Sequence, residues 1–166
     1  MRSRFGYQNI MYLAAGQAVS KVAGKPWGAV VRERIFSPLG MSESNTTIRA
    51  LASLQNVATP HQEIDDNLQV IPWHNIDNIA PAGSINSSAS DMAKWVRFQL
   101  AQGKVGGKVL VSASALGETQ SPQMVVPLSA DAKQVNPFSH LSSYGMGWFL
   151  QDYRGREIRQ HGGNID

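Results

Sequence analysis

The spacing of apolar residues changes along the chain, and this change limits the fold more than any other feature. Over residues 9–23 the apolar side chains recur every three or four positions, which predicts an amphipathic helix that ends at Gly24. A second strong helical pattern begins at Ser88, whose hydroxyl has the spacing of a cap, and ends at Gly103. We expect the apolar stripe of this second helix to be buried: Met92, Trp95, Val96 and Leu100.

Shorter helices are predicted in three further places: from Pro26 to Pro38, over 47–54 and over 112–118. Two long segments, 55–87 and 120–141, show no sustained apolar period and contain several prolines, so we expect them to be structured loops. Loops of this length in a compact domain commonly line a functional site. Within the first of them, Trp73-His74 either lines a cleft or anchors the loop by packing.

The pattern becomes that of β-strands near the C-terminus. Residues 144–153 and 156–160 predict two strands joined by the two-residue turn Arg154-Gly155. No good strand is predicted in the first hundred residues. The sequence therefore predicts an α+β fold in one domain, mostly helical over 1–143 and ending in an antiparallel hairpin within 144–166. Because a lone hairpin exposes an unpaired edge, we expect self-association through that edge.

The composition excludes several classes of function. A length of 166 residues suits a single domain, and the absence of cysteine excludes disulfides and catalytic or metal-binding thiolates. No apolar run approaches the roughly 20 residues of a membrane span. The 15 basic residues exceed the 12 acidic ones but are spread singly, so we expect no nucleic-acid partner. The histidines His61, His74 and His140 lack the spacing of metal ligands, so no metal site is predicted.

Two short motifs could carry chemistry. Tyr7-Gln8-Asn9 precedes the first helix and is either an aromatic anchor with a helix cap, or a tyrosine general base with an amide beside it. His161-Gly162-Gly163 follows the last strand. It is either a strand end before a glycine turn, or a basic residue followed by backbone that a substrate can approach closely. Each motif taken singly is weak evidence.

Together the two motifs and the segments between them resemble the serine β-lactamase and penicillin-binding-protein-like family, in the branch that contains class C β-lactamases, DD-peptidases and related esterases. The resemblance covers essentially the whole chain. It rests on the following segments: Phe5-Gly6-Tyr7-Gln8-Asn9, Gly24-Lys25-Pro26-Trp27, Arg34-Ile35-Phe36-Ser37-Pro38-Leu39-Gly40-Met41, Pro81-Ala82-Gly83-Ser84-Ile85, Ser87-Ser88, Asp91-Met92-Ala93, Tyr144-Gly145-Met146-Gly147-Trp148 and His161-Gly162-Gly163. It implies a β-lactamase/transpeptidase-like fold without a cofactor, of which this chain would hold mainly the helical subdomain and one hairpin of the central sheet.

The resemblance also implies roles for individual residues. Tyr7 matches the tyrosine that shuttles a proton between the nucleophile and the leaving group, and Asn9 matches the asparagine that bonds the catalytic lysine and the substrate amide. His161 matches the basic first residue of the family's Lys/His-x-Gly strand motif. Three further positions are implied to bind the substrate or its oxyanion: Gly162, Gly163 and Asn164. The implied partner is a small acyl compound, namely a peptide, an ester or a β-lactam-like amide, attacked by a serine that forms an acyl-enzyme.

Two departures from the family pattern qualify this expectation. No serine in the chain is followed three positions later by a lysine, so the family's Ser-x-x-Lys nucleophile is absent and we expect an inactive internal fragment of a larger enzyme. A non-catalytic helical interaction module, or a truncated inactive product, is the alternative. In addition, His161 replaces a lysine. Because histidine is only partly charged at neutral pH, this favours a peptidase, esterase or amidase over a dedicated β-lactamase.

Overall fold

The computed structural model describes residues 4–165, which form two compact units. The helical unit comprises residues 8–96 together with Ile165, and the sheet unit comprises residues 4–7 and 97–164. The residues just before the first helix therefore belong with the end of the chain. None of the helices in the described part of the chain combines the length and the apolar content of a membrane span.

The helical unit begins with three α-helices: α1 (Ile10–Ala23), α2 (Trp27–Val31) and α3 (Ser37–Leu39). The first and third end at Gly24 and Gly40, whose φ angles of 63° and 68° are left-handed and cost glycine little. The single helix predicted from Pro26 is interrupted by a π-helical turn, η1 (Arg32–Phe36). Pro38 lies in the first turn of α3 instead of ending the helix, and proline is tolerated there because the first N–H groups of a helix lack partners within it.

Three short helices follow: the 3₁₀-helices η2 (Ile48–Ser53) and η3 (Asp77–Ile79), and α4 (Ala80–Gly83). Thr47 caps η2, since its hydroxyl accepts the Arg49 N–H at 3.2 Å. Helix α4 packs against α1 at Gly16, where an added Cβ would overlap the ring of Pro81. The buried apolar core of this unit lies around these helices: Val31, Phe36, Leu39, Met41 and Leu51.

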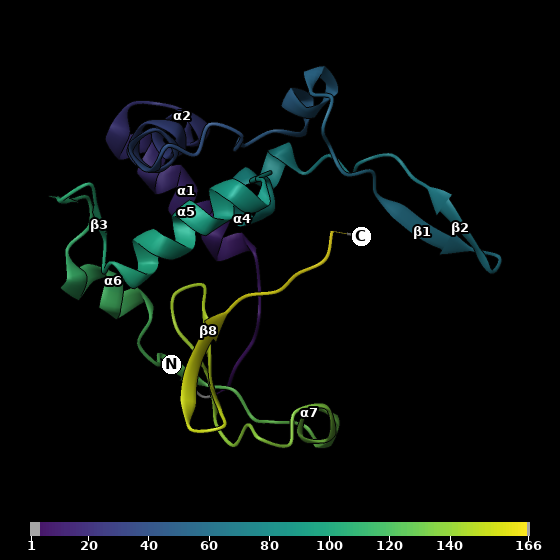
Figure 1. The fold of residues 1–166 in the computed structure, drawn as a ribbon, viewed down its shortest axis with the longest axis vertical. Coiled ribbons are helices and arrows are strands. Elements are labelled where there is room, and N and C mark those ends of the chain that lie inside the picture. The colour runs from purple at the N-terminus through teal and green to yellow at the C-terminus, as the bar shows by residue number, and fades with distance from the viewer. Residues whose placement is uncertain (1–3, 166) are drawn as a thin grey trace. The chain divides into compact units, whose positions relative to one another are not determined.

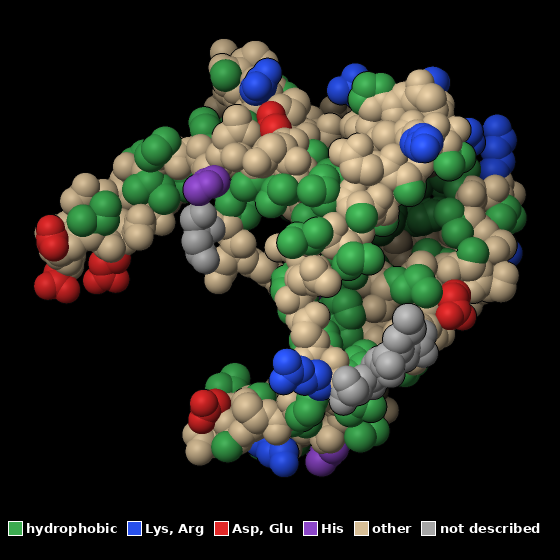
Figure 2. Space-filling model, turned by 180° about the vertical axis from the view of Figure 1, so that it is seen from behind, with side chains coloured by type: hydrophobic (Ala, Val, Ile, Leu, Met, Phe, Trp, Pro, Cys, Tyr) green, Lys and Arg blue, Asp and Glu red, His purple; other side chains and the backbone are tan. Residues whose placement is uncertain are grey.

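The segment 55–87 contains a β-hairpin that the sequence did not predict, in which β1 (His61–Ile64) pairs with β2 (Asn67–Val70). The expectation that the first hundred residues lack strands is therefore wrong. Every residue of both strands is exposed, so the apolar–polar alternation that marks a half-buried strand is missing. The turn is Asp65-Asp66, with φ angles of 50° and 60° that suit a two-residue hairpin turn. The hairpin projects from the helices of its unit (Figure 1), with acidic side chains at its tip (Figure 2).

Helix α5 (Ala89–Leu100) begins as predicted, with the Ser88 hydroxyl accepting the Asp91 N–H at 3.2 Å. The predicted burial of its apolar stripe is wrong at three positions, which are 44%, 50% and 79% exposed: Met92, Val96 and Leu100. The buried face instead contains Asp91 and Phe98. This face turns inward because the Asp91 carboxylate bonds the Ser44 hydroxyl at 2.8 Å, and that contact orients the helix against the preceding loop.

The sheet unit is antiparallel throughout. A small hairpin pairs β3 (Lys104–Val105) with β4 (Lys108–Val109), and the predicted helix over 112–118 follows as α6 (Ala113–Thr119), capped by Ser112. The main sheet has four strands in the order β5-β6-β7-β8: β5 (Met124–Val125), β6 (Ser142–Tyr144), β7 (Phe149–Tyr153) and β8 (Arg156–Gln160).

The predicted C-terminal hairpin is confirmed, but the sheet around it is larger than predicted. Strands β7 and β8 are joined by Arg154-Gly155, with φ angles of 49° and 74°. The predicted loop over 120–141 contains two short elements, strand β5 and helix α7 (Ala130–Val135), and β5 and β6 extend the sheet beyond the hairpin. Strand β5 has only two residues, too few for any alternation to show in the sequence.

Candidate active site

Tyr7 and His161, which lie at opposite ends of the chain, come together in one aromatic cluster of the sheet unit. The cluster has five members: Phe5, Tyr7, Tyr144, Phe149 and His161. The ring centroids of Tyr7 and His161 are 5.8 Å apart, with the rings tilted by 44°. Tyr7 is also edge-on to Tyr144 at 6.3 Å, and its side chain is 49% exposed. A phenol and an imidazole therefore share a partly exposed surface, as proton transfer between them and a substrate would require.

The register of the sheet explains why these side chains meet. Tyr144 pairs with Phe149 across β6 and β7, and Phe149 pairs with Gln160 across β7 and β8. His161 is the next residue after Gln160, so it reaches the same end of the sheet as Tyr144. The Tyr144 hydroxyl lies 3.2 Å from His161 Nε2. The imidazole is thus held by Tyr144 of β6, a strand that belongs to neither sequence motif.

Strand β8, which ends directly before His161, is itself held in place by polar side chains. Arg159 donates to the Glu157 carboxylate at 2.8 Å and also to the Gln120 side-chain carbonyl. Gln120 in turn donates to Gln99 at 2.7 Å, which joins β8 to the end of α5. The guanidinium of Arg159 lowers the pKa of the Glu157 carboxyl by hydrogen bonding to it. This network fixes the position of the strand two residues before His161.

The glycines after His161 have no evident role in the local fold. Neither Gly162 nor Gly163 has a left-handed φ angle, and a Cβ added to either would meet nothing within 4 Å. Both residues and Asn164 are exposed. Since neither backbone conformation nor packing requires glycine here, the bare backbone is available for the close approach of another molecule.

Asn9, the remaining predicted catalytic residue, begins the helical unit. It stands at the N-cap of α1, where its carbonyl accepts the N–H groups of Tyr12 and Leu13 at 3.1 and 3.2 Å. Its side chain makes no capping hydrogen bond, and its φ and ψ angles of −87° and −21° are helical. The interpretation of this asparagine as a side-chain cap is therefore wrong. Its proposed contact with a lysine and a substrate stays a prediction.

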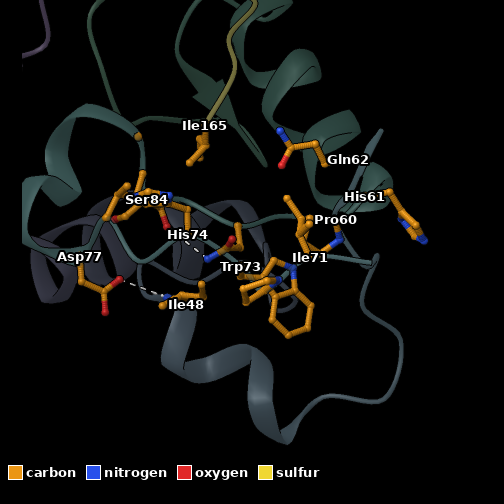
Figure 3. Close-up of a pocket in the computed structure, with 14 residues that line it drawn as sticks. Ile48, Pro60, His61, Gln62, Ile71, Trp73, His74, Asp77, Ser84 and Ile165 are labelled. Carbon is orange, nitrogen blue, oxygen red and sulfur yellow. Dashed lines mark hydrogen bonds between the residues drawn. The ribbon is translucent and has the colours of Figure 1, made fainter. Parts of the chain in front are cut away.

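The helical unit contains a pocket of about 490 Å³ that the sequence indicated only through Trp73-His74. Apolar side chains dominate its lining: Ile48, Pro60, Ile71, Pro72, Trp73 and Ile76. Figure 3 shows Trp73 beside Pro60 and Ile71, with Ile165 across the opening and Asp77 bonded to the backbone of Ile48. Trp73 both lines the pocket and donates to the Ala58 carbonyl at 3.3 Å, so the two alternatives for this residue hold together. Among residues 4–165, no three His, Asp or Glu side chains gather as metal ligands.

Comparisons with known proteins place this chain in a family. The chain is 30% identical over 180 residues to unguisins hydrolase ungD from Aspergillus violaceofuscus, covering 99% of this chain and 31% of that protein. It is 26% identical over 154 residues to penicillin-binding protein 4 from Amycolatopsis lactamdurans, covering 90% and 38% respectively. The chain thus spans about a third of the length of these curated relatives.

Solved structures share the fold. An octameric penicillin-binding-protein homologue from Pyrococcus abyssi superimposes with a TM-score of 0.81 at 21% identity, over 96% of this chain and 33% of that one. A D-stereospecific amidohydrolase from a Streptomyces species gives 0.73 at 24% identity, over 98% and 44%. The chain therefore has a β-lactamase/transpeptidase-like fold of mixed helices and sheet. The sequence model described as Beta-lactamase matches residues 1–165, and the chain accordingly belongs to the beta-lactamase family.

Proposed function

We propose that this chain forms part of a serine hydrolase that cleaves an amide or ester through an acyl-enzyme, with Tyr7 and His161 as its proton-transfer pair. The observation that carries the proposal is the 5.8 Å approach of these two rings in the sheet unit. Membership of the beta-lactamase family supports it, as do relatives named as hydrolases.

The proposed reaction has two halves. A serine hydroxyl attacks the acyl carbon, its proton passes to Tyr7, and Tyr7 returns that proton to the departing amine or alcohol as the scissile bond breaks. Water then attacks the acyl-serine ester, and the same tyrosine moves the proton from the water back to the serine. His161 lies beside Tyr7 and supports it and the substrate as a hydrogen-bonding group. The Asn164 N–H donates to the carbonyl oxygen as it becomes negative.

The nucleophile of this reaction lies outside the 166 residues, because none of their serines stands in a Ser-x-x-Lys motif. The chain by itself is therefore inactive in this proposal. A fluorophosphonate probe should leave the purified chain unlabelled, and stoichiometric labelling would contradict the proposal. In the gene, an in-frame Ser-x-x-Lys upstream of Met1 is expected, whereas a promoter and stop codon there would favour an inactive short protein.

We further propose that the pocket of the helical unit receives an apolar group of the substrate. The pocket is lined by Ile165 together with apolar side chains from residues 48–76 of the same unit. The apolar lining stabilises an aromatic or branched group by removing it from water. Phenylalanine amide combines such a group with a cleavable amide, and a solved structure of this fold is named a D-amino acid amidase.

A titration with D-phenylalanine amide tests the pocket without requiring turnover. We expect the NMR signal of the Trp73 indole to shift on titration and to saturate with one dissociation constant. The variant Trp73→Ala should weaken binding several-fold, while Leu68→Ala on the exposed hairpin should leave it unchanged. Binding that is unaffected by Trp73→Ala would remove the pocket from the proposal.

We also propose that the chain self-associates through the outer edge of β8. No strand of the described residues covers that edge, and all five residues of β8 are exposed. The Pyrococcus abyssi homologue of the same fold is octameric. Sedimentation velocity should show oligomers that Ile158→Lys disperses, because a lysine on an edge strand opposes pairing. The control Leu68→Lys, on the separate β1–β2 hairpin, should leave the oligomers intact, and a wild-type monomer at all concentrations would refute association.

A further inference from the structure

Tyr144 bonds the imidazole of His161 from outside both catalytic motifs. It lies on β6, its hydroxyl is 3.2 Å from His161 Nε2, and the two ring centroids are 6.0 Å apart. Its ring is packed edge-on against Phe149 at 4.9 Å. This packing limits where the hydroxyl can go, so the hydroxyl is aimed at His161 by the sheet.

The second hydrogen bond of His161 determines which ring nitrogen carries the proton. Nδ1 lies 2.6 Å from the Gly162 carbonyl oxygen, and a carbonyl can only accept a hydrogen bond. Nδ1 must therefore carry a hydrogen. In the neutral ring Nε2 is then the acceptor, and the Tyr144 hydroxyl is the donor that satisfies it.

We propose that Tyr144 is a positioning residue that holds His161 in the Nδ1–H tautomer and aims its ring at Tyr7. The tyrosine hydroxyl suits this task in both charge states of the histidine. It donates to Nε2 of the neutral imidazole, and it can rotate to accept from Nε2–H of the imidazolium, so His161 can gain or lose a proton without moving. Tyr7 and Tyr144 are the titratable side chains that contact the His161 ring.

The inference rests on the proposed function only in giving His161 a catalytic role. Its test measures the protonation of the two His161 ring nitrogens directly. Long-range ¹H–¹⁵N spectra of the 166-residue chain at pH 8 report which nitrogen of each histidine is protonated. His161→Asn identifies the His161 signals. We expect the wild-type ring to be predominantly Nδ1–H, and a predominantly Nε2–H ring would overturn the proposal without any further variant.

The variant Tyr144→Phe keeps the ring packing and removes the hydroxyl. We expect the ratio of Nδ1–H to Nε2–H at His161 to fall about 2- to 10-fold, the range set by one ordinary hydrogen bond. Tyr153→Phe, on β7 of the same sheet, should leave that ratio unchanged. His140 serves as the internal reference, because its Nδ1 bonds the Asp152 carboxylate and not Tyr144. An unchanged His161 ratio in a folded Tyr144→Phe protein would overturn the proposal.

Failure of this inference and failure of the proposed function give different results. If the tautomer ratio responds to Tyr144→Phe but Tyr7→Phe leaves the kcat of an active, longer polypeptide unchanged, the positioning contact stands and the catalytic assignment fails. If Tyr7→Phe abolishes turnover and the ratio does not respond, the catalytic assignment stands and Tyr144 has no positioning role. Support for both requires that Tyr144→Phe also shifts the pH profile of kcat, while Tyr153→Phe does not.

Discussion

The Asp91 carboxylate accepts the backbone N–H of Glu43 at 2.8 Å, across 48 positions of the chain. The side chain of Asp91 has no exposed surface, and its other partners are the Ser44 hydroxyl and Lys94 Nζ, both at 2.8 Å. Burial by itself raises the pKa of this carboxyl, but the hydrogen bonds from Lys94, Ser44 and Glu43 outweigh burial and lower it. The carboxylate thus fastens the loop after α3 to the first turn of α5.

Replacing this carboxylate should destabilise the protein. We expect Asp91→Ala to lower the free energy of unfolding by about 2–3 kcal/mol, because it removes three hydrogen bonds to a buried charged group, from Glu43, Ser44 and Lys94. Urea unfolding followed by circular dichroism measures the change. The matched control is Asp66→Asn in the exposed hairpin turn, where asparagine tolerates the left-handed φ angle of 60°. If Asp91→Ala lowers the free energy of unfolding no more than Asp66→Asn does, the Asp91 carboxylate does not hold the loop to α5.

Acid should weaken the hydrogen bonds that the Asp152 carboxylate accepts. Its carboxylate accepts the N–H of Leu141 and both the side chain and N–H of His140, which lower its pKa to about 2. Because the folded pKa lies below the unfolded value near 3.9, the contribution of Asp152 to stability is present above about pH 4 and is lost as the pH falls toward 2. The stability difference between wild type and Asp152→Asn should therefore shrink between pH 5 and pH 2.5 in urea titrations. A difference that stays constant over this range would exclude the carboxylate as its source.

Two glycine substitutions in helices should have opposite effects. Gly16→Ala places a methyl group where Pro81 lies, so overpacking should cost about 1–3 kcal/mol. Gly117→Ala adds a methyl group to α6 where nothing lies within 4 Å, and it should stabilise by about 0.5–1 kcal/mol, because alanine loses less backbone freedom than glycine. Thermal unfolding of both variants tests the pair. Equal effects would show that α1 and α4 do not approach at Gly16 as described.

Gly163→Ala should show whether this glycine is needed for folding or for ligand binding. The backbone φ angle is not left-handed and an added Cβ would contact nothing, so we expect the free energy of unfolding to change by less than about 0.5 kcal/mol. Binding of D-phenylalanine amide should nevertheless weaken, because the methyl group occupies the space through which the substrate approaches the backbone. If binding is unchanged and stability falls, the glycine serves the fold instead.

The hairpin turn and the helix ends of this protein could be predicted from the sequence, because they depend on neighbouring residues. Gly24 ends α1, Ser88 caps α5, and Arg154-Gly155 joins the last two strands, as predicted. These features follow from local backbone preferences and from hydrogen bonds that span at most a few positions. The motifs around Tyr7 and His161 were equally visible, because they are contiguous in the chain.

Other features depend on contacts that no local pattern contains. The α5 stripe at Met92, Val96 and Leu100 has ideal helical spacing yet is exposed, because the burial of Asp91 sets which face of the helix turns inward. The β1–β2 hairpin is exposed along its whole length, so its strands show no alternation of apolar and polar residues. The sequence by itself determined the family, the main helices, the C-terminal hairpin and the candidate residues. Only the tertiary structure decided that Tyr7 lies beside His161, 154 positions away, and that Tyr144 bonds the imidazole, 17 positions away. The second contact follows from the register of the sheet, which no local pattern contains.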